Sequence, residues 1–257
     1  KDGFEKIDLP EVEFLKIENL YCVLLKPKDF NPSKKYPLIV YVYGGPHAQI
    51  VSDRFGGTNF LFHSLLVQEG FLVASIDNRG SYGRGKEFEG AIYKEFGKNE
   101  LEDQLKGIKH LKDLGFIDER KCGIWGWSYG GFMVLYSLTH TDTFKAGFAV
   151  APVVDWNLYD TIYTERYLGL PEENKNGYFN SSPINFIKNL KGNLYIVHGT
   201  GDDNVHFQNT INFINELIRE KISFNLMVYP ERNHSIRDEK ARVHLFEEIL
   251  KFFKEKL

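Results

Sequence analysis

The amino-acid sequence predicts an α/β fold, in which a mostly parallel central sheet carries helices on both faces. Short β-rich runs alternate with amphipathic stretches along most of the chain, as in sheets built from strand–helix units. Most of these runs are nearly continuous in apolar residues, which is typical of strands that helices cover on both faces. A length of 257 residues suits one large domain of this kind.

The predicted strands follow one another at regular intervals along the chain. They cover residues 13–26, 37–43, 71–76, 121–125, 146–150, 194–198 and 224–229. The first strands are joined by short polar turns such as KDFNPSKKYP, and such short connections favour an antiparallel amino-terminal edge.

The predicted helices occupy the segments between these strands. Leu101, Leu105, Ile108 and Leu111 recur at helical spacing within 99–115, and Gly115 is a typical helix stop. The same period predicts helices over 206–221 and 238–257, and the last of these contains Phe252 and Phe253, whose exposure the sequence leaves open.

Composition excludes several classes of protein. The net charge is −3 and no basic stripe occurs, which argues against a nucleic-acid partner. The longest apolar stretches, such as PLIVYVY, are too short to span a bilayer. Cys22 and Cys122 each lie in an apolar run and are expected to be buried free thiols. No signal peptide is recognisable, and the sequence makes no prediction of the compartment.

The segment WGWSYGG places Ser128 in the pattern Gly126-x-Ser128-x-Gly130. A predicted strand precedes it, and an apolar run that predicts a buried helix follows at 131–139. In this context G-x-S-x-G is the nucleophile elbow of the α/β-hydrolase fold, whose tight turn requires small neighbours. The alternative is a glycine-rich turn with an incidental serine, but the flanking elements favour the elbow. Trp125 and Trp127 are expected to support it from beneath.

A serine hydroxyl becomes nucleophilic only when a base removes its proton. This fold supplies the acid and the base later in the chain, in the order Ser, Asp or Glu, His. His234 lies in the loop ERNHSI before the last predicted helix, and is the expected base. Asp202 and Asp203 follow the strand 194–198, and Asp155 follows the strand 146–150. Spacing alone leaves the acid open among these three.

The remaining histidines have other predicted roles. His198 ends a buried strand and is expected to be a hydrogen-bonded structural residue, whereas His47 is a weaker candidate near the site. His206 opens a helix, and surface or packing roles are expected for His63, His110, His140 and His244. Asp77 precedes the serine and is expected to cap the turn DNRGSYGRG.

The tetrahedral oxyanion of acyl transfer needs two hydrogen-bond donors. The backbone N–H of Tyr129, directly after the nucleophile, is one. The second is expected from the loop YGGPHAQ, in which Pro46 has no N–H. The phenol of Tyr43 could donate there, or Tyr43 could simply pack at the strand end.

Five segments together resemble the catalytic domain of the prolyl oligopeptidase family, and most of all its dipeptidyl peptidase IV branch. They are KKYPLIVYVYGGP, GWSYGGF, YTERYLGLP, HGTGDDNVHFQ and NHSI, and they run in order from about Lys34 to His234. The resemblance implies a single hydrolase domain over 1–257, with 1–33 as an amino-terminal extension and edge strands. Family members usually carry a β-propeller, which we expect to lie outside this chain, together with the acidic residues that clamp a substrate amine.

The resemblance also implies a role for each site residue. It makes Ser128 the nucleophile, Asp202 the acid and His234 the base, with Tyr43 as oxyanion donor beside the Tyr129 N–H. An S1 pocket for proline or alanine would be walled by the Tyr129 ring, and Asn204 would hold the carbonyl of the preceding substrate residue. The other S1 residues implied are Val153, Trp156, Tyr159, Tyr163 and Val205.

The expected function is that of a serine peptidase cleaving after Pro or Ala through an acyl-enzyme. By resemblance it would be of the dipeptidyl-peptidase or prolyl-oligopeptidase type, with peptides as substrates and homodimerisation as a further expectation. A broad carboxylesterase on the same triad, an acylaminoacyl peptidase and a non-catalytic binding protein are the alternatives. The mechanism requires no metal or organic cofactor.

Overall fold

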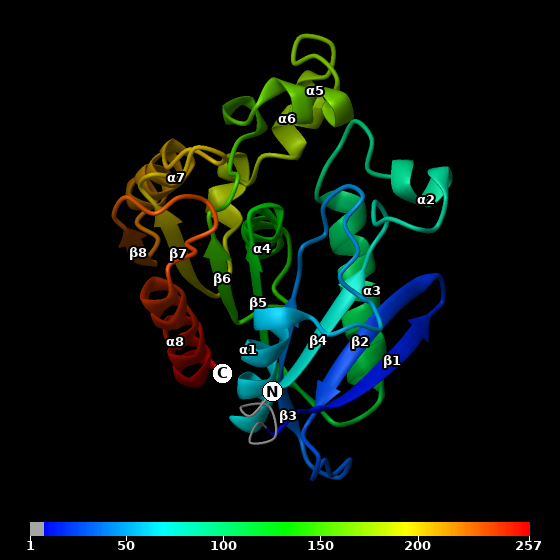
Figure 1. The fold of residues 1–257 in the computed structure, drawn as a ribbon. Helices are drawn as coiled ribbons and strands as arrows, with labels where there is room; N and C mark the ends of the chain where they lie inside the picture. Colours follow the sequence, from blue (N-terminus) through cyan, green and yellow to red (C-terminus); the bar gives the residue numbers. More distant parts are fainter. Residues whose placement is uncertain (1–7) are drawn as a thin grey trace.

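A computed structural model describes residues 8–257, and its centre is one eight-stranded sheet (Figure 1). The strands lie in the order β1-β2-β4-β3-β5-β6-β7-β8. Their bounds are β1 Glu11–Ile17, β2 Leu20–Lys26, β3 Tyr36–Tyr41, β4 Leu72–Asp77, β5 Ile117–Trp127, β6 Ala146–Val150, β7 Asn193–Gly199 and β8 Asn225–Tyr229. The strands from β4 to β8 pair in parallel, so the predicted α/β-hydrolase fold is confirmed.

The amino-terminal edge is antiparallel, as predicted, but the single strand expected over 13–26 is wrong. It is a hairpin of β1 and β2, and β2 also pairs antiparallel with β4. The chain reverses at Glu18 and Asn19, where Glu18 has a φ of 54°. Two polar residues between apolar runs form this short turn. Residues 1–7 of the predicted extension lie outside the described part of the chain.

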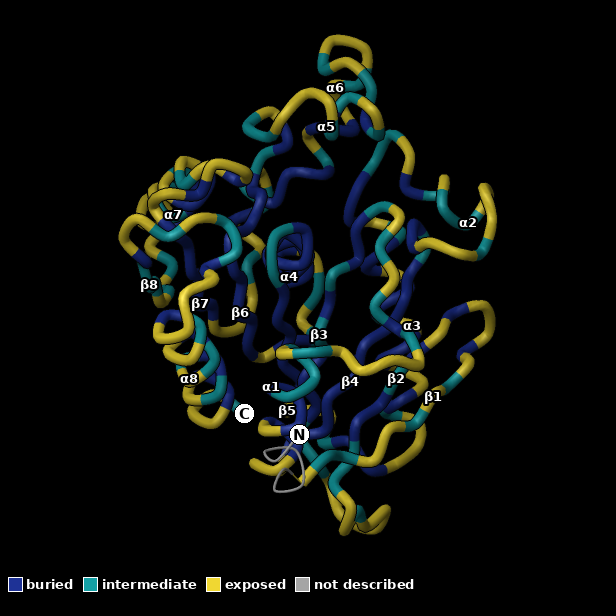
Figure 2. The backbone as a smooth tube through the Cα atoms, in the orientation of Figure 1, coloured by how far each residue is buried: buried dark blue, intermediate teal, exposed yellow. Residues whose placement is uncertain are grey.

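Helices cover both faces of the sheet. On one face α1 (Gly57–Gln68) and α8 (Glu239–Lys256) pack on strand residues such as Ile39 and Val197. On the other, α3 (Lys98–Asp113), α4 (Tyr129–His140) and α7 (Gln208–Arg219) pack on residues such as Ile124. The inner strands are therefore buried on both sides (Figure 2), and every residue of β4 is buried.

Four predicted helices agree with α3, α4, α7 and α8 to within two residues, while several others were not predicted. The missed helices are α1, α2 (Lys86–Gly90), α5 (Thr161–Leu168) and α6 (Lys175–Asn180). Apolar residues lie all around α1, which removes the stripe that marks a helix, and the others are too short to show a period. Phe252 and Phe253 are buried in the core. No helix among residues 8–257 combines the length and the apolar composition needed to cross a bilayer.

Candidate active site

Ser128 lies between β5 and α4, in the tight turn that the sequence predicts. Its φ of 61° and ψ of −117° are unusual for a non-glycine residue. A β-carbon added to Gly126 would lie 2.5 Å from the Val42 carbonyl oxygen, and one added to Gly130 only 2.2 Å from it. The glycines therefore let the turn approach β3 closely enough to hold this strained backbone.

His234 and Asp202 meet at the carboxyl ends of the last two strands. Asp202 follows β7, His234 follows β8, and His234 Nδ1 lies 2.7 Å from Asp202 Oδ2. Because the carboxylate can only accept, Nδ1 carries the proton and Nε2 is left as the basic nitrogen. His234, Ser128 and Asn204 line one cleft of about 400 Å³.

Asp202 is fixed as an anion by hydrogen bonds. Burial acts to raise the pKa of this carboxyl group, but hydrogen bonds from His198 and His234 outweigh it and lower the pKa well below its usual value. The second carboxylate oxygen, Oδ1, accepts the backbone N–H groups of Asn204 at 3.0 Å and Val205 at 2.9 Å. The side chain is thus held on all sides, and it stays ionised at neutral pH.

His198 is the structural histidine that the sequence predicts, but it also contacts Asp202. Its Nε2 lies 2.8 Å from the Val205 carbonyl oxygen and 3.1 Å from Asp202 Oδ2, so Nε2 carries the proton. Its Nδ1 lies 2.7 Å from the Thr210 hydroxyl. No sequence pattern indicates that one carboxylate oxygen, Asp202 Oδ2, faces two histidines.

Tyr43 lines the same cleft as Ser128, just beyond the end of β3. Burial, followed by the nearby Tyr167, raises the pKa of its phenol, which therefore keeps its proton at neutral pH. Its ring lies 6.0 Å from that of Tyr129. A protonated phenol in the same cleft as Ser128 is suited to donate to an oxyanion.

The Tyr129 hydroxyl is held by Glu100, a residue that the sequence analysis does not single out. The hydroxyl donates to Glu100 Oε1 at 2.6 Å, and Glu100 Oε2 accepts the Gly97 N–H at 2.9 Å. Glu100 is fully buried, and this burial, partly offset by those hydrogen bonds, raises its pKa to about 7. In the sequence Glu100 resembles any acidic residue in a first helical turn, so only its burial reveals it.

Aromatic rings gather beside the cleft at the residues expected for an S1 pocket. The ring of Trp156 is 5.5 Å from Tyr129, 5.9 Å from Tyr159 and 6.3 Å from Tyr163. Val153 and Val205 are buried in the same apolar cluster. The Tyr159 hydroxyl donates to Asn204 Oδ1 at 2.7 Å. The structure therefore brings this predicted set together.

The weaker candidates lie elsewhere or have other partners. Asp203 is exposed, Asp155 caps the short helix at Trp156–Leu158, and His47 pairs with Glu89 at 3.2 Å. The expectation for Asp77 is wrong, because its carboxylate accepts the N–H groups of Ile50 and Val51. That loop follows β3, so Asp77 holds it rather than the turn after β4.

The two tryptophans of the elbow segment have distinct neighbours. Trp125 is fully buried and packs on Tyr41, Phe62 and His63. Trp127 is half-buried, and its Nε1 donates to the carbonyl oxygen of His234 at 2.8 Å. The second contact links the segment that carries Ser128 to the loop that carries His234, and no sequence pattern predicts it.

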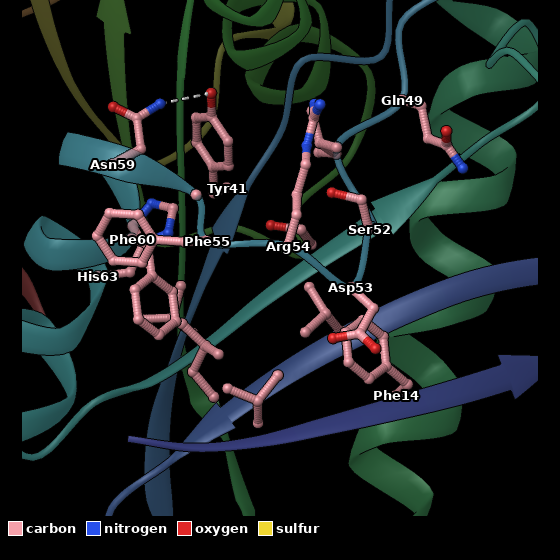
Figure 3. Close-up of a pocket in the computed structure, with 17 residues that line it drawn as sticks. Phe14, Tyr41, Gln49, Ser52, Asp53, Arg54, Phe55, Asn59, Phe60 and His63 are labelled. Carbon is pink, nitrogen blue, oxygen red and sulfur yellow. Dashed lines mark hydrogen bonds between the residues drawn. The ribbon is translucent and has the colours of Figure 1, made fainter. Parts of the chain in front are cut away.

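A separate hollow of about 580 Å³ lies next to the cleft, between the β1–β2 hairpin and α1. Figure 3 shows residues that line this hollow, among them Asn59, which donates to the Tyr41 hydroxyl at 3.1 Å. Tyr41 and Asn59 line both spaces. Among residues 8–257 no group of three or more His, Cys, Asp or Glu side chains could hold a metal ion.

Comparison with known proteins connects this geometry to one family. The model of the prolyl oligopeptidase family matches residues 59–257. Prolyl endopeptidase FAP of Mus musculus is 37% identical over 99% of the chain, and human dipeptidyl peptidase 8 is 40% identical over 93% of it. The chain spans 34% of the first protein's length and 27% of the second's.

Two solved structures have the same fold as this chain. The crystal structure of Porphyromonas gingivalis dipeptidyl peptidase 4 matches 98% of the chain with a TM-score of 0.92 and 40% identity. That of a putative dipeptidyl aminopeptidase IV from Bacteroides ovatus matches all of it, with a TM-score of 0.94 and 37% identity. The chain covers 36% and 37% of these two chains.

Proposed function

The chain belongs to the prolyl oligopeptidase family, and on that premise we propose that it is a serine peptidase domain that cleaves after Pro or Ala. The reaction would be of the dipeptidyl-peptidase or prolyl-oligopeptidase type. One observation carries the proposal: His234 Nδ1 lies 2.7 Å from the ionised Asp202, in the cleft that also contains Ser128. A serine, a histidine and an aspartate so arranged are the machinery of acyl transfer.

The proposed mechanism follows from the proton positions. His234 Nε2 removes the proton of Ser128 while the hydroxyl attacks the substrate carbonyl, and Asp202 stabilises the imidazolium that forms. The Tyr43 phenol and the Tyr129 N–H would hold the oxyanion. The imidazolium then protonates the leaving amine, and a water molecule repeats the sequence to hydrolyse the acyl-enzyme.

Substrate preference would come from the aromatic wall beside Ser128. Rings of Trp156, Tyr159 and Tyr163 present flat apolar surfaces that fit a proline ring and accept alanine. Asn204 Oδ1 is occupied by the Tyr159 hydroxyl. Its amide NH2 group is therefore left to donate a hydrogen bond, and the carbonyl oxygen of the substrate residue before Pro is a suitable acceptor.

The test compares amide and ester hydrolysis. We expect a dipeptide 4-nitroanilide ending in Pro to be turned over, with little turnover when Pro is replaced by Leu. Ser128→Ala should abolish both this activity and labelling by a fluorophosphonate. Rapid hydrolysis of p-nitrophenyl esters with no anilide turnover would instead support the carboxylesterase alternative.

We also propose that residues 1–257 act as one catalytic domain, which is supported by the single sheet that joins all eight described strands. Homodimerisation stays a prediction. Phe252 and Phe253 are buried against the sheet, so a partner would have to contact other residues of α8.

A further inference from the structure

The loop that carries His234 has an unusual backbone. It connects β8 to α8, and Ile236 within it has a φ of 41°. A β-branched residue with positive φ is a conformational outlier, which persists only where its surroundings hold it. Ile236 is buried, so its apolar side chain anchors the loop but cannot orient its peptide groups.

Two side chains hold three consecutive carbonyl groups of this loop. Trp127 Nε1 donates to the His234 oxygen at 2.8 Å. Arg242 donates through Nη2 to the Ser235 oxygen and through Nε to the Ile236 oxygen, the latter at 3.0 Å.

The two donors also contact each other. The Arg242 guanidinium carbon lies 4.7 Å from the Trp127 ring centroid, in a cation–π arrangement. Arg242 belongs to the second turn of α8, whose first turn is fixed by the Asp238 carboxylate accepting the Ala241 N–H at 3.0 Å. Both donors therefore stand on rigid elements, one at the end of β5 and the other on α8.

We propose that Trp127 and Arg242 form a clamp that positions His234 relative to Ser128. This inference rests on the proposed function, since it assigns positioning residues to the same site. Trp127 is the residue before Ser128, so the segment that carries the nucleophile also holds the carbonyl of the base. Arg242 fixes the next two peptide groups and keeps the indole in place. The clamp thereby sets the position of the base by direct contact with the nucleophile segment.

A rival role for Arg242 is to bind substrate. Arg242 lines the catalytic cleft together with Trp127 and Asn59, where a cation could receive a peptide carboxylate beyond the scissile bond. The two roles differ in one respect. A clamp acts in every reaction of Ser128, whereas a substrate contact acts only when the substrate extends past the cleaved bond.

The experiment measures Ser128 phosphonylation by a small fluorophosphonate. In this reaction the Ser128 oxygen bonds to phosphorus, fluoride leaves, and the serine proton passes to His234, so a positioned base is needed but no leaving peptide is present. We expect Arg242→Met to slow labelling on the order of 10- to 100-fold. On the Pro 4-nitroanilide it should lower kcat by a similar factor and leave KM within about twofold. Arg242→Lys, which keeps one donor, should recover part of the rate.

Two further variants sharpen the test. Trp127→Phe keeps a ring for the guanidinium but removes the N–H, and should also lower kcat with little change in KM. Combined with Arg242→Met it should cost less than the product of the two factors, because both break one assembly. Arg237→Met is the matched control, because Arg237 is an exposed cation of the same loop, and its labelling rate should equal that of the parent.

Unchanged labelling in folded Arg242→Met and Trp127→Phe would overturn the clamp, even if thermal stability fell. A change confined to KM for peptides extended past the scissile bond would assign Arg242 to substrate binding and would also overturn it. If the parent protein itself does not react at Ser128 and cleaves no peptide, the proposed function fails and the clamp fails with it.

Discussion

Asp202 contacts two histidines through one carboxylate oxygen, because Oδ2 faces both His198 and His234. Asp202→Asn would replace one accepting oxygen by an NH2 donor, which must face either the two imidazole N–H groups or the two backbone N–H groups that Oδ1 accepts. Donor would meet donor in both orientations, so the tautomer and the position of His234 would no longer be held. We expect kcat/KM to fall by about 10⁴-fold while the protein stays folded. Asp203→Asn, at the exposed neighbouring position, is the control and should retain full activity.

The same carboxylate makes stability depend on pH in the acid range. Its folded pKa lies below the value of the unfolded chain, which is about 3.9 for an aspartate. Its contribution to the free energy of unfolding is therefore complete above the unfolded pKa, and it is lost as the pH falls toward the folded pKa. Urea unfolding between pH 5 and pH 3 should show this loss, and Asp202→Asn should show less of it.

Glu100 makes stability depend on pH in the opposite direction, because its pKa is raised in the folded protein. Its pKa rises from 4.5 in the unfolded chain to about 7 in the fold, so the folded state retains a proton that the unfolded state releases. Stability should fall as pH rises from about 4.5 to 7 and then level off, by on the order of 2–3 kcal/mol. In Glu100→Gln this decline should be absent from urea unfolding measured at pH 5 and pH 8. An equal decline in the variant would assign the effect to another group.

At the scale of elements, the site depends on how closely α4 approaches β3. In Gly130→Ala the new methyl group would overlap the Val42 carbonyl oxygen, which forces the start of α4 and the Tyr129 N–H away from the cleft. We expect kcat to fall by at least 10²-fold, the effect of losing one oxyanion donor, together with a lower Tm. Gly90→Ala is the control, because a methyl group there meets no atom within 4 Å, and its kinetics should match the parent.

Strands and helices can be predicted from the sequence where apolar residues recur at a regular spacing. Side-chain contacts between segments far apart in the chain cannot. Ser128 and His234 could be found from residue order, because each strand of a parallel sheet ends at the same edge. Asp202 could not be separated from Asp203 and Asp155 by spacing, since only the turn after β7 decides which carboxylate faces the histidine. Glu100 and Trp127 act through partners far along the chain, and no local pattern encodes such pairings.

At the scale of the whole molecule, the two thiols report on the integrity of the core. Cys22 on β2 and Cys122 on β5 are fully buried, and this burial raises both pKa values to about 12. We expect neither to react with a disulfide reagent at pH 8 in the native protein, and both to react in guanidinium chloride. Rapid reaction of one thiol under native conditions would indicate that the sheet opens locally near that strand.

The placement of the base after β8, at the far edge of the sheet, has a consequence for biosynthesis. Tyr43 follows β3, and Ser128 and Tyr129 follow β5, so all three leave the ribosome before Asp202 and His234, which lie 32 residues apart. A nascent chain can therefore close most of its sheet while Ser128 still has no partner for its proton. With the proposed function, the domain would hydrolyse no substrate until β8 and the loop that carries His234 have joined the sheet.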